Sequence, residues 1–207
     1  LDESYQRVFL TVEILRSWFG ARSRRLLEPL AYLIRICEKR DDVPTALEHH
    51  LERHRLLETG QSSPEELFSS RVALLPIRAM LGQVDDLMQE ATKSQSELST
   101  LGSVAASEFA SVLLPTALRL ERLHWRVQEA VRLLEMALAA VPDNEVSLAC
   151  RLQVALAECQ ARRDYRSQAE TLRKRTMERV SSLESESRAE ILHEMAESCL
   201  RVRELVA

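Results

Sequence analysis

Three arginines in the second half of the chain have the spacing of a single helix face, and their chemistry suits an anion. Arg119, Arg122 and Arg126 stand at positions i, i+3 and i+7, and Trp125 lies beside the last of them. Residues three and four apart are neighbours on a helix surface. A guanidinium grips a carboxylate or a phosphate with two parallel hydrogen bonds. The spacing therefore predicts that these four residues bind an acidic or phosphorylated segment of a protein partner.

The alternative to a binding surface is an ordinary solvated helix face, on which the arginines form ion pairs with Glu121 and Glu129. A nucleic-acid surface is disfavoured, because Trp125 is the single aromatic side chain beside the arginines and such surfaces usually interleave several. The chain of 207 residues also has a formal net charge of −4 at pH 7, whereas nucleic-acid-binding domains are usually basic. The predicted partner is therefore a protein.

The second candidate for chemistry is the histidine cluster in the segment EHHLERH, residues 48–54. His50 and His54 stand at i and i+4 on the expected helix, so both could face one metal ion. No cysteine lies near them in sequence to supply a further ligand. We therefore expect His49, His50 and His54 to lie on a solvated helix face and predict no metal site.

Sequence signals of catalysis are scarce. The four glycines form no GxGxxG fingerprint, no phosphate-binding P-loop and no GxSxG elbow. The spacing of the cysteines suits neither a zinc site nor a small disulfide scaffold, so we expect free, buried thiols. These cysteines are Cys37, Cys150, Cys159 and Cys199. The sequence thus predicts a protein that is not an enzyme and uses no cofactor.

The ends of the sequence and its apolar stretches bear on location. No apolar stretch approaches the about 20 residues that a membrane-spanning helix needs, and no signal peptide is visible. The sequence starts at Leu1 without an initiator methionine and ends inside a helical pattern. We expect residues 1–207 to be one domain of a longer chain in an intracellular compartment, the cytoplasm or the nucleus.

The elements that must position these residues are helices. Hydrophobic residues make up 45% of the chain, and only four glycines and six prolines interrupt it. Alanine, leucine, glutamate, arginine and glutamine dominate, which is the composition of helices. No alternating apolar pattern of useful length indicates a strand. The predicted fold class is all-α.

Helical segments recur along the chain with a period near 40 residues. The corresponding positions Ala46, Leu87, Ala130 and Ala169 are 41, 43 and 39 residues apart. A period of this length is the signature of a helical solenoid, in which each hairpin packs on the next. The pattern predicts four antiparallel helix hairpins, at residues 24–58, 64–98, 104–142 and 145–180.

Two segments of this array resemble the tetratricopeptide repeat (TPR). In EAVRLLEMALAAVP, residues 129–142, the family's alanine, large apolar residue, alanine and proline are matched by Ala130, Leu134, Ala137 and Pro142. The segment RDYRSQAETL, residues 163–172, resembles the turn and second-helix start of the motif. The resemblance implies a right-handed α-solenoid of antiparallel hairpins whose first helices line a concave groove. It also implies a non-enzymatic scaffold that binds a partner peptide or helix in that groove.

Departures from the TPR pattern keep a second architecture open. Arg53 and Leu87 occupy positions where the TPR pattern has small residues. The spacing of 39 to 43 residues also exceeds the 34 residues of a standard TPR. HEAT-like hairpins are the alternative.

Prolines interrupt the apolar runs of three expected helices. Pro76 and Pro115 fall well inside first helices of hairpins, where they predict kinks that lie against the core. Pro29 falls near a helix start, where a proline costs little. The alternative is that each proline starts a new, shorter helix.

The N-terminal segment leaves two further functions open. The helix expected over residues 3–20 has an apolar face formed by Val8, Val12, Leu15 and Phe19. Trp18, on the same helix, either plugs the core or marks a seam to an upstream repeat. The chain could therefore be a structural subunit that assembles through helix edges into a larger complex or homodimer. It could also be a regulatory module attached to an enzymatic domain outside residues 1–207.

Overall fold

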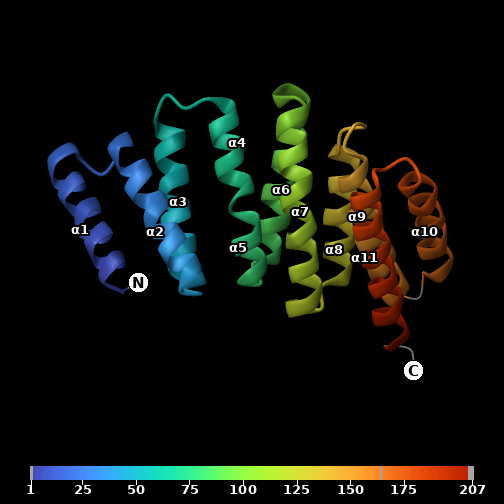
Figure 1. The fold of residues 1–207 in the computed structure, drawn as a ribbon. Helices are drawn as coiled ribbons and strands as arrows, with labels where there is room; N and C mark the ends of the chain where they lie inside the picture. The colour runs from blue at the N-terminus through green and yellow to red at the C-terminus, as the bar shows by residue number, and fades with distance from the viewer. Residues whose placement is uncertain (1, 164, 205–207) are drawn as a thin grey trace. The chain divides into compact units, whose positions relative to one another are not determined.

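The computed structural model describes residues 2–163 and 165–204, and these residues form helices joined by short turns (Figure 1). None of them lies in a β-strand, so the predicted all-α class is confirmed. No helix in the described part of the chain combines the length and apolar character needed to cross a bilayer. Contacts divide the chain into two compact units, residues 1–90 and 91–207. The first contains the histidine cluster and the second contains the arginines.

The first unit follows the predicted alternation of helices and short loops. Its elements are α1 (Asp2–Phe19), the 3₁₀ segment η1 (Arg24–Leu26), α2 (Leu27–Lys39), α3 (Val43–Thr59), α4 (Pro64–Val72), α5 (Leu75–Met80) and the first part of α6 (Val84–Leu101), which runs across the division. α2 and α3 pack against each other, and the short turn between them makes the pair antiparallel. The hairpin predicted over residues 24–58 is therefore confirmed.

The leucines of α2 form the centre of the core in this unit. Leu30 and Leu33 are fully buried, and they cluster with Val12 of α1 and Leu56 of α3. The two leucines are three residues apart, so they lie on one face of α2. Burying a leucine stabilises the fold by roughly 1.5–3 kcal/mol. The position of α1 against α2 and α3 follows from this cluster.

The start of α4 is fixed by a capping box. The backbone N–H of Glu66 donates to the Ser63 hydroxyl at 3.1 Å, and the Ser63 N–H donates to the Glu66 carboxylate at 3.1 Å. Pro64 occupies the first turn, where its missing N–H needs no partner. These three residues therefore set the start of α4.

Pro76 divides the helix that was predicted to be kinked. α4 ends at Val72, and α5 begins at Leu75 with Pro76 in its first turn. A proline ring collides with the carbonyl four residues earlier in a continuous helix, and here that carbonyl belongs to Val72, where α4 stops. The kink prediction is wrong at this position, and the alternative of a new, shorter helix is correct.

The second unit contains two further hairpins and a final helix. Its elements are the remainder of α6, α7 (Ser103–His124), α8 (Val127–Ala140), α9 (Val146–Arg162), α10 (Arg166–Val180) and α11 (Ser185–Glu204). α7 packs against α8, and α9 packs against α10 (Figure 1). The hairpins predicted over residues 104–142 and 145–180 are therefore confirmed in the described part of the chain.

α9 is the central helix of the second unit. It packs against α7, α8, α10 and α11, and most of its residues are buried on all sides. A helix covered all round is rich in small and apolar residues, which explains the run from Ala149 to Ala161. Glu158 in this run is charged and buried, so it needs ion-pair partners, which are described with the interaction surface below.

The four positions that defined the repeat period are all buried. Ala46 and Ala169 are each 1% exposed, and Leu87 and Ala130 have no exposed surface. A small residue lets two helix backbones approach closely, and Ala130 lies on α8, which packs against both α7 and α9. The predicted burial of Ala130 and Ala169 is confirmed.

Pro115 lies inside α7, which continues through it as predicted. The prediction that this proline faces the core is wrong, because Pro115 is exposed. Its ring removes the hydrogen bond to the carbonyl of Ser111, which is also exposed. Water can satisfy that carbonyl on the outer side of the helix, so the solvent face is the less costly place for the proline.

Candidate interaction surface

The histidine cluster is buried rather than solvated. His49 and His50 are each 8% exposed, so the expectation of a solvated helix face is wrong. α3 packs against α2, α4 and α5, and this covers the face that the sequence pattern left open. No group of three potential ligands that could hold a metal ion occurs in residues 2–163 and 165–204.

Each of the three histidines has its own surroundings. The Tyr5 hydroxyl lies 3.3 Å from Nε2 of His49, and Nδ1 of His54 lies 3.3 Å from the Ser70 hydroxyl. His50 lies deepest, and burial, with Arg53 and His49 as further causes, lowers its pKa from 6.5 to about 4. His50 is therefore a neutral core residue.

The cysteines are not placed for thiolate chemistry. Cys37, Cys150 and Cys159 are buried, as predicted, and Cys199 is half-buried. Burial raises the pKa of Cys159 to about 12, so its reactive thiolate form is suppressed at neutral pH.

The end of α7 brings exposed apolar and basic side chains together. Trp125 is 77% exposed, and Leu123 is 58% exposed. Arg119, Arg122 and Arg126 are exposed as well. These five residues are called the Arg-Trp surface from here on. Large apolar side chains are exposed here beside three positive charges, a combination typical of an interface.

Trp125 has a backbone conformation that is rare for its residue type. Its φ is 55°, in the left-handed region, and its N–H donates to the carbonyl of Glu121 at 3.0 Å. Glycine normally occupies this position at a helix end, because a side chain there is strained. The backbone strain of a tryptophan in this conformation destabilises the fold by about 1 kcal/mol. A tryptophan at this position is therefore not explained by its contribution to stability.

Arg126 does not lie on the helix face of the other two arginines. α7 ends at His124, and Trp125 and Arg126 form the turn that leads into α8. The predicted sharing of one helix face by all three arginines is wrong, because it assumed a helix that continued through residue 126. The turn still leaves Arg126 exposed beside Trp125, and it lies 3.7 Å from the carboxylate of Glu129.

Arg119 and Arg122 make no ion pair with any residue that the structure describes. The alternative of a solvated face named Glu121 and Glu129 as partners of the arginines, and Arg126 does pair with Glu129. The Glu121 side chain points inward instead, is 3% exposed, and pairs with Arg162 of α9. The two guanidinium groups are therefore available to an anion from outside the unit.

A buried charge network lies directly beneath the Arg-Trp surface. Arg162 bridges Glu121 and Glu158, with a distance of 2.9 Å to the latter, and Arg201 of α11 donates to Glu158 at 2.9 and 3.1 Å. Burial raises the pKa of the Glu158 carboxyl, but Arg201 and Arg162 outweigh this and hold the pKa below its usual value. The network ties the end of α7 to α9 and α11.

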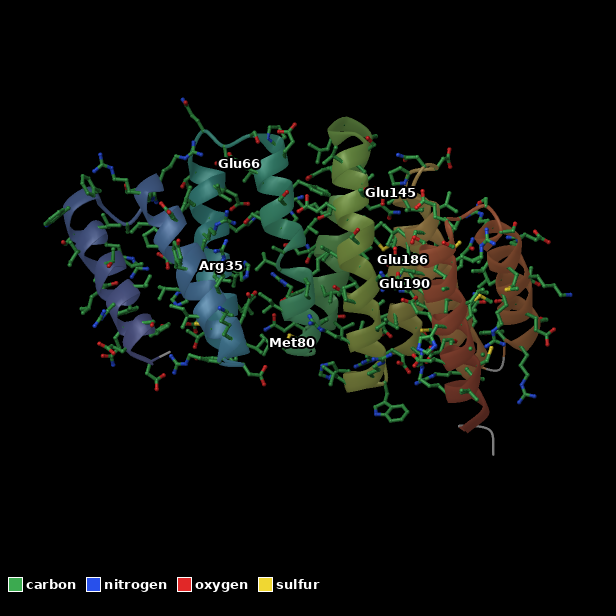
Figure 2. The ribbon with its side chains drawn as sticks, in the orientation of Figure 1. Arg35, Glu66, Met80, Glu145, Glu186 and Glu190 are labelled. Atoms are coloured by element: carbon green, nitrogen blue, oxygen red, sulfur yellow. The ribbon has the colours of Figure 1, made fainter. Side chains whose placement is uncertain are left out.

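The opposite end of the second unit is acidic. Ser107, near the start of α7, donates to Glu145 at the start of α9, while the ends of the same two helices meet at the Glu121–Arg162 pair. α7 and α9 are thus parallel. Glu186 and Glu190, on the first turns of α11, are exposed near the same end as Glu145 (Figure 2). The second unit therefore carries exposed arginines at one end and exposed glutamates at the other.

Trp18, the other tryptophan, lies in the first unit. It is 74% exposed, so it does not plug the core as one expectation had it. Phe19 beside it is 44% exposed and is covered by the Arg25 guanidinium, 3.9 Å from the ring centre. Leu10 and Ile14 are also exposed on α1. Sequence reasoning missed these two, although their position opposite Val8 and Val12 on a helix could have indicated them.

Sequence reasoning also missed the buried network. Glu158 stands in the run LQVALAECQA, residues 152–161, whose other residues are mostly small or apolar. A charge at a core position needs a partner, so Glu158 could have been identified as paired. No family model matches the chain, and no curated protein matches its sequence.

Proposed function

We propose that the chain is a non-enzymatic protein-interaction module, and that the Arg-Trp surface binds an acidic segment that carries an apolar anchor. The observation that supports this best is Trp125 itself, which is exposed and has a strained backbone. It lies beside Leu123 and beside two arginines that form no ion pair with the residues that the structure describes. Tryptophan and arginine are the residues that contribute most often to the energy of protein interfaces.

The proposed architecture is a stack of TPR-like hairpins, with HEAT-like hairpins as the alternative. Two observations support a stack within the second unit. α9 packs against both helices of the preceding hairpin and against α11 of the following one. Ala130 and Ala169, which carry the TPR resemblance, are buried, and Ala169 of α10 packs against Ala157 and Ala161 of α9. Such a stack offers a continuous surface to a partner.

The proposed partner segment combines carboxylates or phosphates with one large apolar side chain. Arg119 and Arg122 would hold the anionic groups, because a guanidinium fork matches their geometry. Leu123 and Trp125 would cover the apolar anchor. The positive charges would also accelerate association with an acidic partner.

The test uses Trp125 as its own reporter. The chain has two tryptophans, so Trp18→Phe leaves Trp125 as the only one. The probe is a short synthetic peptide in which Glu and Asp surround a Leu-Phe pair. We expect a saturable blue shift of the Trp125 emission on titration. The shift should weaken as salt rises, because exposed charges are screened beyond about 8 Å at physiological ionic strength.

Two variants with the same charge change make the test specific. Arg119→Glu with Arg122→Glu should weaken binding by roughly tenfold or more with the melting temperature nearly unchanged. Lys174→Glu with Arg175→Glu, on the exposed face of α10, should leave the affinity within about twofold. Equal effects of both pairs, or no shift of Trp125 emission by the acidic peptide, would contradict the proposal.

A second candidate function is supported by a separate observation in the first unit. α1 exposes Leu10, Ile14 and Trp18, which is the pattern of a helix with an additional packing partner. This observation favours a subunit that assembles through a helix edge.

A further inference from the structure

α1 has apolar residues on two opposite faces. Val8, Val12 and Leu15 pack against the core of the first unit. Leu10, Ile14 and Trp18 are 60%, 48% and 74% exposed. At about 100° per residue, the directions of the second set centre roughly 130° away from those of the first. A helix that is apolar on two faces is normally covered on both.

The outer face of α1 is uncovered within its own unit. The helix contacts η1, α2 and α3 there, all on its inner side. Figure 1 shows α1 at the edge of the first unit, with α2 beside it. The inner contacts include the Arg16–Glu52 ion pair and the Tyr5–His49 contact, so α1 is held in place without the outer residues.

The outer residues follow the spacing of a coiled-coil seam. Successive steps of four, three, four and three residues connect Glu3, Arg7, Leu10, Ile14 and Ser17, and Trp18 lies next to the last. Steps of this kind keep one stripe of a helix facing a partner helix along its length. The two central positions of the stripe, Leu10 and Ile14, are apolar, and the positions toward its ends are charged or small. A narrow stripe of this kind fits a partner helix and not a flat surface.

We propose that this outer face of α1 is a homodimer interface, in which α1 of a second copy packs antiparallel to it. Leu10 faces Ile14 of the partner subunit, and Ile14 faces Leu10 of the partner subunit. Each contact occurs twice about a two-fold axis, as in most soluble dimers. Arg7 then faces Ser17 of the partner subunit, which is small. The Arg7 guanidinium can therefore lie over the neighbouring indole ring of Trp18 of the partner subunit.

The charges on the stripe fit a second copy in this orientation. In a parallel pair Glu3 would face its own counterpart and Arg7 would do the same, so like charges would meet in the seam. In the antiparallel pair Arg7 meets an aromatic ring, an attractive cation–π contact. Glu3 keeps its ion pair with Arg7 within α1, and Asp2 pairs with Arg40 of its own copy. This acidic start of α1 then approaches the basic segment RSRR, residues 22–25, of the other copy.

The size of the interface sets the expected strength. A single helix pair of this length buries less than the roughly 1,200 Å² typical of stable interfaces. The dimer should therefore be weak and concentration-dependent, with dissociation in the micromolar range or above. The dimer rests on the second candidate function, assembly through a helix edge, and does not involve the Arg-Trp surface. Its failure and the failure of peptide binding at the Arg-Trp surface are therefore distinguishable.

Sedimentation equilibrium over micromolar to submillimolar concentrations tests the association. The wild-type chain should shift from monomer to dimer across this range. Leu10→Glu with Ile14→Glu should remain monomeric, with an unchanged helical circular dichroism because both side chains are exposed. The matched control, Trp125→Ala, should dimerise as the wild type does. A wild-type monomer throughout, or a dimer that survives the double change, would overturn the proposal.

Disulfide trapping tests the antiparallel register. In a Cys199→Ser background the remaining cysteines are buried. Leu10→Cys mixed with Ile14→Cys should give a heterodisulfide, because the two positions face each other. Either variant alone should give little, since an offset of four residues, about 6 Å along the helix, puts the Cα atoms beyond the roughly 7 Å limit for a disulfide. A strong homodisulfide of Leu10→Cys would indicate a parallel pair and overturn the proposed register.

Discussion

Trp18 and Trp125 are the two tryptophans of the chain, and their surroundings differ although their exposures are similar, 74% and 77%. Trp18 extends an apolar stripe on a regular helix in the first unit. Trp125 occupies a strained turn among arginines in the second unit. Exposure alone therefore does not define what a surface binds. The neighbouring residues differ, and we propose accordingly a second helix as the partner of Trp18 and an acidic segment as the partner of Trp125.

The two tryptophans are also supported differently. α1 rests on apolar contacts around Val12, whereas the Trp125 turn rests on the ion pairs of Glu121 and Glu158 with arginines. Each tryptophan can report on its own unit, because Trp125→Phe leaves Trp18 as the only one and Trp18→Phe leaves Trp125. The predictions below use these two backgrounds.

The largest expected effect comes from breaking the buried network. Glu158→Ala leaves Arg162 and Arg201 without their shared carboxylate, which is 5% exposed. Removing one partner of a buried ion pair costs about 3 kcal/mol or more. Urea unfolding followed by Trp125 fluorescence should show this loss in the second unit, while the Trp18 transition should move much less.

Glu197 provides the control for this prediction. It also pairs with Arg201, but its side chain is 51% exposed. Glu197→Ala should change stability by no more than about 0.5 kcal/mol, because surface ion pairs contribute little. Equal losses from the two alanine variants would contradict a special role for the buried network. Equal movement of both tryptophan transitions would show that the two units unfold together.

Acid should affect the first unit before the second. His50 has its pKa lowered from 6.5 to about 4 in the folded protein, so the unfolded chain takes up a proton more readily. The stability that the neutral form contributes is complete above pH 6.5 and is lost as the pH falls from there through 4. The loss amounts to roughly 3 kcal/mol at most.

The Trp18 reporter should therefore show a falling unfolding midpoint over this pH window. The pKa of Glu158 is lowered as well. Because Glu158 is a carboxyl, the stability that its charged form contributes is lost only at a pH below this window. The unfolding midpoint reported by Trp125 should therefore stay constant to a lower pH than the midpoint reported by Trp18. His50→Leu should flatten the pH dependence seen by Trp18. A Trp18 midpoint that is independent of pH between 6.5 and 4 would contradict this account of His50.

Local patterns were sufficient to predict the helices and the small residues between them. The helical composition, the short loops between helices and the repeat positions at Ala130 and Ala169 are each set by residues close in sequence. These predictions are confirmed because helix formation and hairpin packing depend on short-range spacing. The same reasoning placed the outer bounds of the hairpins over residues 24–58, 104–142 and 145–180 close to where the structure has them.

Features that depend on distant residues were not predictable in this way. The burial of His49 and His50 depends on α3 being covered by α2, α4 and α5, which a helix pattern does not encode. Glu121 meets an arginine 41 residues later, so its inward orientation has no local signal. The end of α7 was missed for a different reason, because Trp125 stands where glycine would normally mark the end of a helix.

Overpacking the hairpin beneath the Trp125 turn should have an intermediate effect. Ala130 has no exposed surface, and α8 packs against α7 and α9. Ala130→Leu should therefore displace a neighbouring helix and cost about 1–3 kcal/mol. Ala139 is exposed on the same helix, and Ala139→Leu should change stability by less than about 0.5 kcal/mol. Thermal unfolding of both variants measures the difference. An unchanged melting temperature for Ala130→Leu would show that Ala130 does not lie in a tight helix contact.

The smallest expected effects are opposite in sign at the two tryptophans. Trp125→Gly removes the strain of a side chain at a φ of 55°, and glycine is favoured at that position of a helix end. It should therefore stabilise the second unit by about 0.5–1 kcal/mol. Trp18→Gly places glycine in a helix with ordinary backbone angles and should destabilise the first unit by a similar amount, about 0.5–1 kcal/mol.

Chemical denaturation followed by circular dichroism can measure both changes without a tryptophan reporter. The comparison becomes sharper when binding is measured on the same samples, with a fluorescein-labelled form of the acidic peptide. Trp125→Gly should be more stable than the wild type and yet lose affinity for the peptide, whereas Trp18→Gly should be less stable and keep its affinity. A residue that lowers stability while raising affinity is retained for binding, since the fold alone would prefer glycine there. If Trp125→Gly is instead destabilising, the Trp125 side chain contributes to folding, and the central argument for the Arg-Trp surface fails.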